Sequence, residues 1–264
     1  MPTLAVLSVH GIGTQTSNYA DRFHARLTKR LASHGWQVEA ETALWSPELD
    51  GTEHALLRAA TAQGAQASLL RQLATFTLAD ALAYREATPA WLRIQRTVAT
   101  ALDRLYAPWR RRAAAGTPLF ILAHSLGCAV VSDYLQTQLA RVTGYGLTEL
   151  RGFMTFGCNI PLLTLGKPFY APPLRNARWE NFYDPDDFLG FPLKVVPEIE
   201  NVVNDHQVNV GNLFTWWNGL SHLGYWDDRK FARIVADRIL WILANPPDTL
   251  EDTVPNQDPT KILH

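Results

Sequence analysis

Apolar stretches of two kinds alternate along the chain. Short apolar or alternating runs are typical of strands, and apolar residues repeating every three to four positions are typical of amphipathic helices. The runs predict strands at residues 3–9, 36–45, 119–122, 150–157, 179–184 and 201–210. The repeats predict helices at residues 18–34, 89–114, 126–141 and 228–244. Strands and helices in this order predict an α/β fold with a doubly wound, mostly parallel sheet.

One part of the chain is longer than the connection between two parallel strands requires. Residues 52–87 are rich in alanine and leucine and contain no proline, so they predict helix. Together with the helix at 89–114 they predict a helical insertion at about residues 52–115. We expect residues 1–245 to form one domain, because no Gly/Ser-rich linker divides them. Residues 246–264 carry four prolines and little periodicity, which predicts a flexible tail.

Composition and charge exclude several classes of function. The 264 residues include 24 basic and 25 acidic side chains without a basic stripe, which argues against a nucleic-acid partner. No apolar run has the about 18 residues that a membrane-spanning helix needs. The N-terminus has no basic region before its first apolar run, so we expect no signal peptide and a cytoplasmic protein. Cys128 and Cys158 predict buried free thiols, and no Cys/His spacing suggests a metal site or another cofactor.

The strongest chemical motif is Ala123-His-Ser-Leu-Gly127, which follows the apolar run at 119–122 and precedes a helical pattern. A serine between small residues at a strand-to-helix turn is typical of a nucleophile elbow. The turn is tight, so the positions two before and two after Ser125 need small side chains, and Ala123 and Gly127 provide them. Ser125 is therefore predicted at the carboxyl end of a strand and the N-terminus of a helix, where helix amides favour a developing negative charge.

A serine nucleophile needs a base to take its proton and a third group to orient that base. Acids at 184–187 follow a later predicted strand, and His206 and His222 follow the acids. The loops at 10–13, 124–126, 184–187 and 216–222 each come after a predicted strand. Because carboxyl ends of parallel strands share one edge of a sheet, we expect these loops to converge there.

These pieces together resemble the α/β-hydrolase superfamily, especially its serine lipases, esterases and thioesterases. The matching residues are Val9-His-Gly-Ile-Gly13, the motif at Ser125, the late acid cluster and a histidine before the final helix. The resemblance implies a version of the fold that lacks the two N-terminal strands of larger relatives. It also implies an oxyanion hole made by the backbone N–H groups of Ile12 and Leu126. Ala123 stands where glycine is commoner in the family.

The acid and the base each have competing candidates. Asp187 is followed by Phe-Leu-Gly-Phe-Pro, which fits the family pattern better than Asp184 or Asp186, both of which suit a turn. His222 lies in a loop directly before the final helix, where the family places its base. His206 lies in an alternating strand pattern, which favours a structural role.

Two further histidines flank the predicted site. His10 precedes the oxyanion glycine, and we expect it to brace that loop by hydrogen bonding. His124 is expected to point away from the active face, because neighbouring side chains diverge at the elbow.

The predicted function is that of a serine hydrolase that cleaves a carboxylic ester or thioester of a small molecule or lipid through an acyl-enzyme on Ser125. The apolar, proline-broken loop at 160–178 and the helical insertion favour an apolar acyl group. Trp216, Trp217 and Trp226 either line that pocket or pack in the core. The alternatives are an acyltransferase with the same triad and a binding protein that keeps the fold without activity.

Overall fold

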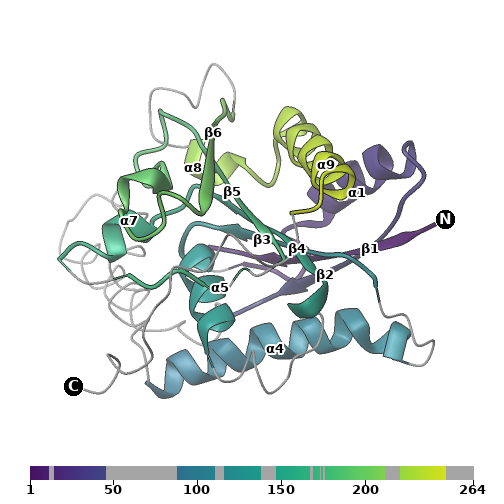
Figure 1. The fold of residues 1–264 in the computed structure, drawn as a ribbon, viewed down its shortest axis with the longest axis horizontal. Coiled ribbons are helices and arrows are strands. Elements are labelled where there is room, and N and C mark those ends of the chain that lie inside the picture. Colours follow the sequence, from purple (N-terminus) through teal and green to yellow (C-terminus); the bar gives the residue numbers. More distant parts are fainter. Residues whose placement is uncertain are drawn as a thin grey trace, which may run out of the picture.

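We analysed a computed structural model of the chain, which describes residues 1–11, 15–45, 88–110, 116–137, 147–166, 169–172, 174, 176–211 and 221–247. These ranges hold a six-stranded sheet and the helices that cover it (Figure 1). The strands are β1 (Thr3–Val9), β2 (Gln37–Ala43), β3 (Leu119–His124), β4 (Leu150–Phe156), β5 (Arg178–Tyr183) and β6 (Val203–Gln207). The α-helices are α1 (Asp21–Ala32), α4 (Pro89–Arg110), α5 (Leu126–Gln136), α7 (Ile160–Leu163), α8 (Ser221–Gly224) and α9 (Arg229–Ala244). Two 3₁₀ turns are η2 (Leu147–Glu149) and η3 (Leu193–Val195).

The strand order in the sheet is β2-β1-β3-β4-β5-β6, and all five pairings are parallel. The predicted doubly wound, mostly parallel sheet is therefore confirmed. In the register, His124 at the end of β3 pairs with Phe156 at the end of β4. The loops that leave these carboxyl ends consequently start side by side, at the edge where ligands bind in sheets of this kind.

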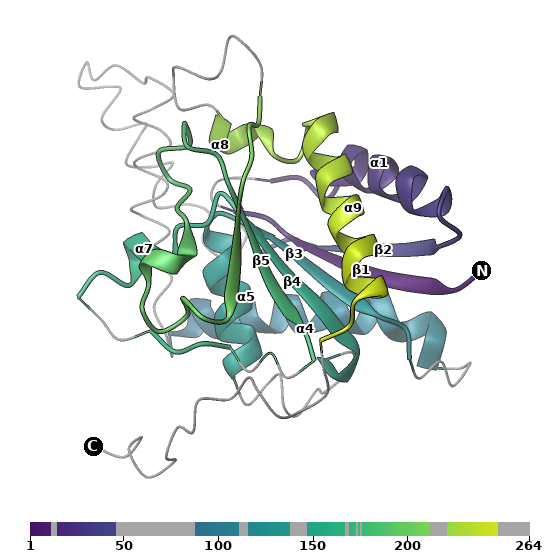
Figure 2. The same ribbon diagram turned by 45° about the horizontal axis from the view of Figure 1, so that its top comes forward.

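Alternate side chains of the central strands pack into two different apolar layers. On β1, Leu4 and Val6 pack with helices α1 and α9, whereas Ala5 and Leu7 pack with α4 and α5. Figures 1 and 2 show the same arrangement, with α1 and α9 on one face of the sheet and α4 and α5 on the other. All six residues of β3 are buried, as expected for a strand covered on both faces. The site at the end of β3 is thus built on the most enclosed strand of the sheet.

The predicted elements agree with the structure apart from their ends and two short helices, α7 and α8, in stretches that were predicted as loops. The helix predicted from residue 18 begins at Asp21, because Thr16 to Asp21 form hydrogen-bonded turns first. The stretch 160–178, predicted as a loop, begins with the four-residue helix α7. Pro161 lies in its first turn, where a missing N–H costs nothing.

Parts of two predictions fall outside the described residues. Of the predicted insertion at 52–115, the structure describes α4 and the residue before it, but not residues 52–87 or 111–115. Residues 248–264 of the predicted tail also lie outside. The division into one domain, an insertion and a tail stays a prediction. In the ranges that the structure describes, no helix combines the length and apolarity needed to cross a membrane.

Candidate active site

Ser125 occupies a sharp turn between β3 and α5. Its φ of 54° and ψ of −128° lie outside the regions that residues other than glycine favour. Such a conformation costs on the order of 1–3 kcal/mol and persists only where the surroundings hold it. The Ser125 N–H donates to Phe156 O at 3.0 Å, which anchors the turn to β4. The predicted elbow is therefore present as a strained turn.

Two glycines allow the turn to approach the loop after β1. A Cβ on Gly127 would lie 2.4 Å from His10 O, and a Cβ on Gly11 would lie 2.5 Å from Ser125 Cβ. Both distances are too short for a real side chain, so these positions require glycine. The need for a small residue at 127 was predicted from the motif, and its cause is the backbone of residue 10.

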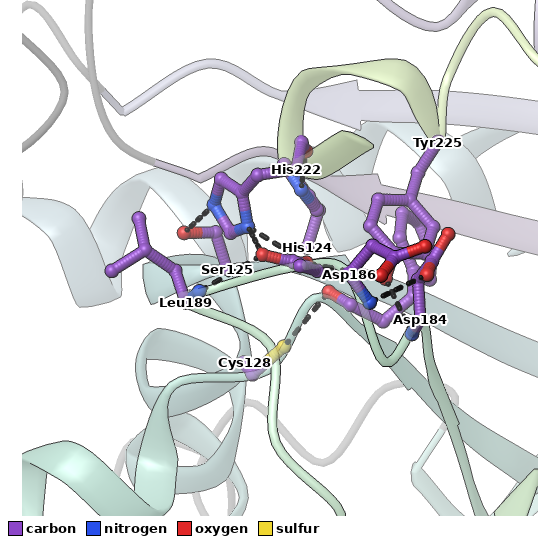
Figure 3. A network of polar contacts seen from close by, with 10 residues as sticks. His124, Ser125, Cys128, Asp184, Asp186, Leu189, His222 and Tyr225 are labelled. Atoms are coloured by element: carbon purple, nitrogen blue, oxygen red, sulfur yellow. Dashed lines mark hydrogen bonds and ion pairs between the residues drawn. The ribbon is translucent and has the colours of Figure 1, made fainter. Parts of the chain in front are cut away.

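His222 lies in the short helix α8 and faces Ser125. Its Nε2 is 2.8 Å from Ser125 Oγ, and its Nδ1 is 2.9 Å and 3.0 Å from the two carboxylate oxygens of Asp187 (Figure 3). A carboxylate can only accept, so Nδ1 carries the proton and Nε2 accepts from the serine hydroxyl. The side chains of Ser125 and His222 are buried, and Asp187 is almost fully so. The tertiary structure thus brings together the three residues predicted as nucleophile, base and acid.

The Asp187 carboxylate has further donors. Leu189 N–H donates to Oδ1 at 2.9 Å, and the Tyr225 hydroxyl donates to Oδ2 at 3.2 Å. Burial acts to raise the pKa of Asp187. The hydrogen bond and charge of His222, with the Leu189 amide, outweigh burial and hold that pKa below its usual value. Asp187 is therefore kept ionised beside the imidazole. Tyr225 is a contributor that the sequence reasoning missed, because nothing in the local pattern around it indicates an acidic partner.

The competing candidates have structural contacts instead. Buried Asp184 accepts from Asp186 N–H at 2.9 Å and from Val210 N–H at 2.6 Å, while Asp186 itself is exposed. His206 Nε2 lies 2.5 Å from the buried Glu180 carboxylate, which also pairs with Arg238 at 2.8 Å. These contacts hold Asp184 and His206 to groups other than the serine–histidine pair. The expected turn role of Asp184 and the structural role of His206 agree with these contacts.

His10 directly follows β1, and its side chain makes hydrogen bonds to the backbone of neighbouring loops, as predicted. Its Nε2 accepts from Trp45 N–H at 3.1 Å, so Nδ1 carries the proton and donates to Gly11 O at 2.7 Å. The indole of Trp45 stacks on the imidazole with centroids 4.8 Å apart and donates to His10 O. Burial lowers the pKa of His10 to about 4, so the ring stays neutral.

His124 does not point away from the site, and the prediction that it would do so is wrong. Its Nε2 donates to the backbone O of His222 at 2.8 Å, and the two rings are 4.8 Å apart. The partner lies 98 residues along the chain, and no local pattern indicates it. Neighbouring side chains do diverge at the elbow, but the segment that carries His222 lies on the side to which His124 points.

The backbone donors of the predicted oxyanion hole are described only in part. Leu126 is the first residue of α5, and the first N–H groups of a helix have no partner within it. The Leu126 N–H therefore has no acceptor within the helix, and it directly follows Ser125 in the chain. Ile12, the other predicted donor, lies outside the described residues.

Three features decide the fold. They are the strand order, the turn at Ser125, and the positions of Ser125, Asp187 and His222 after β3, β5 and β6. The chain has the α/β-hydrolase fold. In the described residues, β1 is the first strand of the sheet and precedes the predicted donor Ile12. The assignment rests on this topology and on the geometry of the turn.

Neither a protein-family model nor a curated protein sequence matches the chain. Solved structures of similar fold include a single-residue variant of SOBER1 from Arabidopsis thaliana, at 12% identity and a TM-score of 0.46, covering 90% of this chain and 99% of that one. Est1E from Butyrivibrio proteoclasticus has 10% identity and a TM-score of 0.43, covering 92% and 89%. The thioesterase domain from the curacin biosynthetic pathway has 10% identity and a TM-score of 0.43, covering 90% and 91%.

Other predicted features have different outcomes. Cys128 and Cys158 are buried free thiols, as expected. Within the described part of the chain, no cluster of three His, Cys, Asp or Glu side chains could hold a metal ion. Trp226 packs in the apolar layer of α1 and α9, with its ring at 4.8 Å from that of Phe156. Trp216 and Trp217 lie outside the described residues.

Proposed function

We propose that this protein is a serine hydrolase that cleaves a carboxylic ester or thioester through an acyl-enzyme on Ser125. The observation that carries the proposal is the continuous set of contacts from Ser125 Oγ to His222 Nε2 and from His222 Nδ1 to Asp187. A serine hydroxyl alone is a poor nucleophile near neutral pH. A base within hydrogen-bond distance, itself oriented by a carboxylate, removes that limitation.

The reaction runs in two half-reactions. Ser125 Oγ attacks the carbonyl carbon while His222 Nε2 takes the hydroxyl proton, and ionised Asp187 stabilises the resulting imidazolium. The tetrahedral intermediate then collapses, and His222 gives the proton to the departing alcohol or thiol. Water enters, loses a proton to His222, attacks the acyl-serine and releases the acid. The proton returns to Ser125, so each turnover consumes one ester and one water.

The charge that develops on the carbonyl oxygen needs donors in place before the reaction. The Leu126 N–H at the start of α5 supports this role, and we propose Ile12 N–H as the second donor. A single donor of this kind is worth on the order of 3 kcal/mol to the transition state. The helix N-terminus adds a favourable dipole at the same point.

An apolar acyl group is the finer part of the proposal. Ile160 is buried in the same apolar layer as Leu126, and Leu163 packs against that layer. These side chains come from α7, which follows β4 beside the end of β3. Apolar side chains thus follow the strand that neighbours β3, which supports a hydrocarbon chain rather than a charged acyl group.

The test is turnover of p-nitrophenyl esters of increasing chain length by the wild-type protein and by Ser125→Ala. Wild type is expected to hydrolyse them and to be labelled by a fluorophosphonate probe, with a preference for longer acyl chains. Ser125→Ala is expected to fold normally and to do neither. Undiminished turnover by Ser125→Ala would refute the assignment, and absence of labelling in wild type would favour a binding protein. An added alcohol that captures the acyl group in place of water would favour acyl transfer.

A further inference from the structure

A hydrogen bond from the residue next to the proposed nucleophile holds the backbone of His222, the proposed base. The carbonyl oxygen of His222 accepts from His124 Nε2 at 2.8 Å, and His124 is the residue before Ser125. The imidazole of His222 is held separately, by Asp187 at Nδ1. Helix α8 has only four residues, so its own hydrogen bonds give His222 little rigidity. Two attachments, one to the backbone and one to the ring, fix where Nε2 lies relative to Ser125 Oγ.

His124 is itself held firmly. Its ring stacks on Phe156 with centroids 5.5 Å apart and contacts the rings of Tyr225 and Trp226. Behind it, Gly157 has a φ of 53°, and a Cβ there would lie 3.1 Å from both His124 Nε2 and Asp187 Oδ2. The absence of a side chain at 157 lets the histidine and the carboxylate lie on either side of one backbone segment. The donor to His222 O is therefore set by packing before any substrate binds.

The protonation state of His124 suits this contact. A carbonyl oxygen only accepts, so Nε2 must carry the proton. Burial, followed by the nearby charge of His222, lowers the pKa of His124 to about 3. The ring is accordingly a neutral donor at the pH where esterases work. It holds the backbone of His222 without placing a second positive charge beside the imidazolium that forms during the reaction.

We propose that His124 is a positioning residue, which aligns His222 with Ser125 by donating a hydrogen bond from Nε2 to the His222 carbonyl. The proposal rests on the proposed function, since it assigns a role within that site. In this role, His124 supports the proposed base His222 through a hydrogen bond that links the elbow directly to α8.

Two substitutions separate the hydrogen bond from the space that the ring fills. The amide nitrogen of glutamine is as many bonds from Cβ as Nε2 of histidine, whereas that of asparagine is one bond shorter. His124→Gln should therefore keep the donor, and His124→Asn should lose it. His34→Asn, at an exposed position at the end of α1, is the matched control for the same change elsewhere.

The expected result is a split between kcat and KM. With His124→Asn, kcat should fall about 10- to 100-fold and KM should change less than about threefold, because a displacement near 1 Å at the reacting groups can cost 100-fold. His124→Gln should stay within about fivefold of wild-type kcat, and His34→Asn should match wild type. Wild-type kcat in His124→Asn would overturn the proposal. Equal loss in both His124 variants, with both folded, would also overturn it, because the ring and not the hydrogen bond would then matter.

A second readout does not need turnover. The proton on His222 Nδ1 gives a downfield ¹H resonance when it is held by a carboxylate, and its position reports the His222–Asp187 geometry. We expect this resonance in wild type and His124→Gln, and a shifted or broadened one in His124→Asn. An unchanged resonance in His124→Asn would overturn the positioning role. If wild type hydrolyses no ester, the proposed function fails, while the resonance still decides whether His124 positions His222.

Discussion

Gly11 and Ser125 approach so closely that only a glycine fits at position 11. A Cβ on Gly11 would lie 2.5 Å from Ser125 Cβ and 3.1 Å from Ser125 Oγ. The loop after β1 and the turn after β3 are thus in van der Waals contact at the nucleophile itself. Because the proposed second oxyanion donor follows directly at residue 12, we expect this contact to affect the distance between Ser125 and that donor.

Gly11→Ala should therefore reduce activity far more than stability. The added methyl group has to displace the loop or Ser125, and we expect kcat/KM for a p-nitrophenyl ester to fall at least about 100-fold. Gly35→Ala is the control, since it lies far from the site in open space with a φ of +83°. That variant should lose about 1 kcal/mol of stability and no activity. Equal activity of Gly11→Ala and wild type would contradict the close approach.

Asp187→Asn and Asp184→Asn should separate the acid of the triad from its structural neighbour. Asp187→Asn removes the charge beside His222 Nδ1, and kcat should fall by roughly three to four orders of magnitude. Asp184→Asn places an amide among backbone N–H donors, so the free energy of unfolding should fall by about 1–3 kcal/mol. Its kcat in the folded protein should stay near wild type. Ester turnover and urea denaturation measure the two effects, and the reverse pattern would assign the acid to Asp184.

Stability should fall as the pH is lowered from 7 to about 5. Burial lowers the pKa values of His10 and His24 to about 4 and that of His124 to about 3, from an ordinary value of 6.5. Below pH 6.5 the unfolded chain binds a proton at each histidine and the folded protein does not, so lower pH favours unfolding. Each histidine contributes roughly 1 kcal/mol per pH unit in this window.

Urea denaturation between pH 5 and 8 checks this dependence. His124→Gln should lessen the slope between about pH 5 and 6.5, because it removes one of these three histidines. Asp187 and Glu180 also have lowered pKa values. Their contribution to folding stability is lost only when the carboxylates protonate, which happens at a pH below this window. A free energy of unfolding that does not change between pH 5 and 7 would contradict neutral buried histidines.

Tyr225→Phe should have a moderate effect on both activity and stability. The hydroxyl donates to Asp187 Oδ2 at 3.2 Å and accepts from Asp184 N–H at 3.1 Å. Phenylalanine keeps the packing but leaves a buried N–H without its acceptor, which should cost about 1–2 kcal/mol. Because Leu189 N–H and His222 still hold the carboxylate, kcat should fall less than about tenfold. A loss as large as that of Asp187→Asn would mean that the tyrosine has a more direct role.

Local patterns were enough to predict most of the fold. β3 is apolar at nearly every position because both faces of the sheet are covered, and that run indicates a buried strand without knowledge of its neighbours. The amphipathic repeat of α9 likewise indicates the face that meets the sheet. Helix α7 was missed because four residues that include a proline are too few to show a period.

The sequence by itself determined the elbow at Ser125, the order of the proposed nucleophile, acid and base, and the preference for Asp187 and His222. These depend on residue types at short spacings and on which strand each loop follows. Only the tertiary structure decided which side chains meet: His124 with the backbone of His222, Tyr225 with Asp187, and Gly11 with Ser125. Such contacts join segments far apart in the chain, and they depend on how parallel strands and their loops pack side by side. No local sequence pattern predicts that packing, so the contacts that hold the side chains of the site in place could be seen only in the tertiary structure.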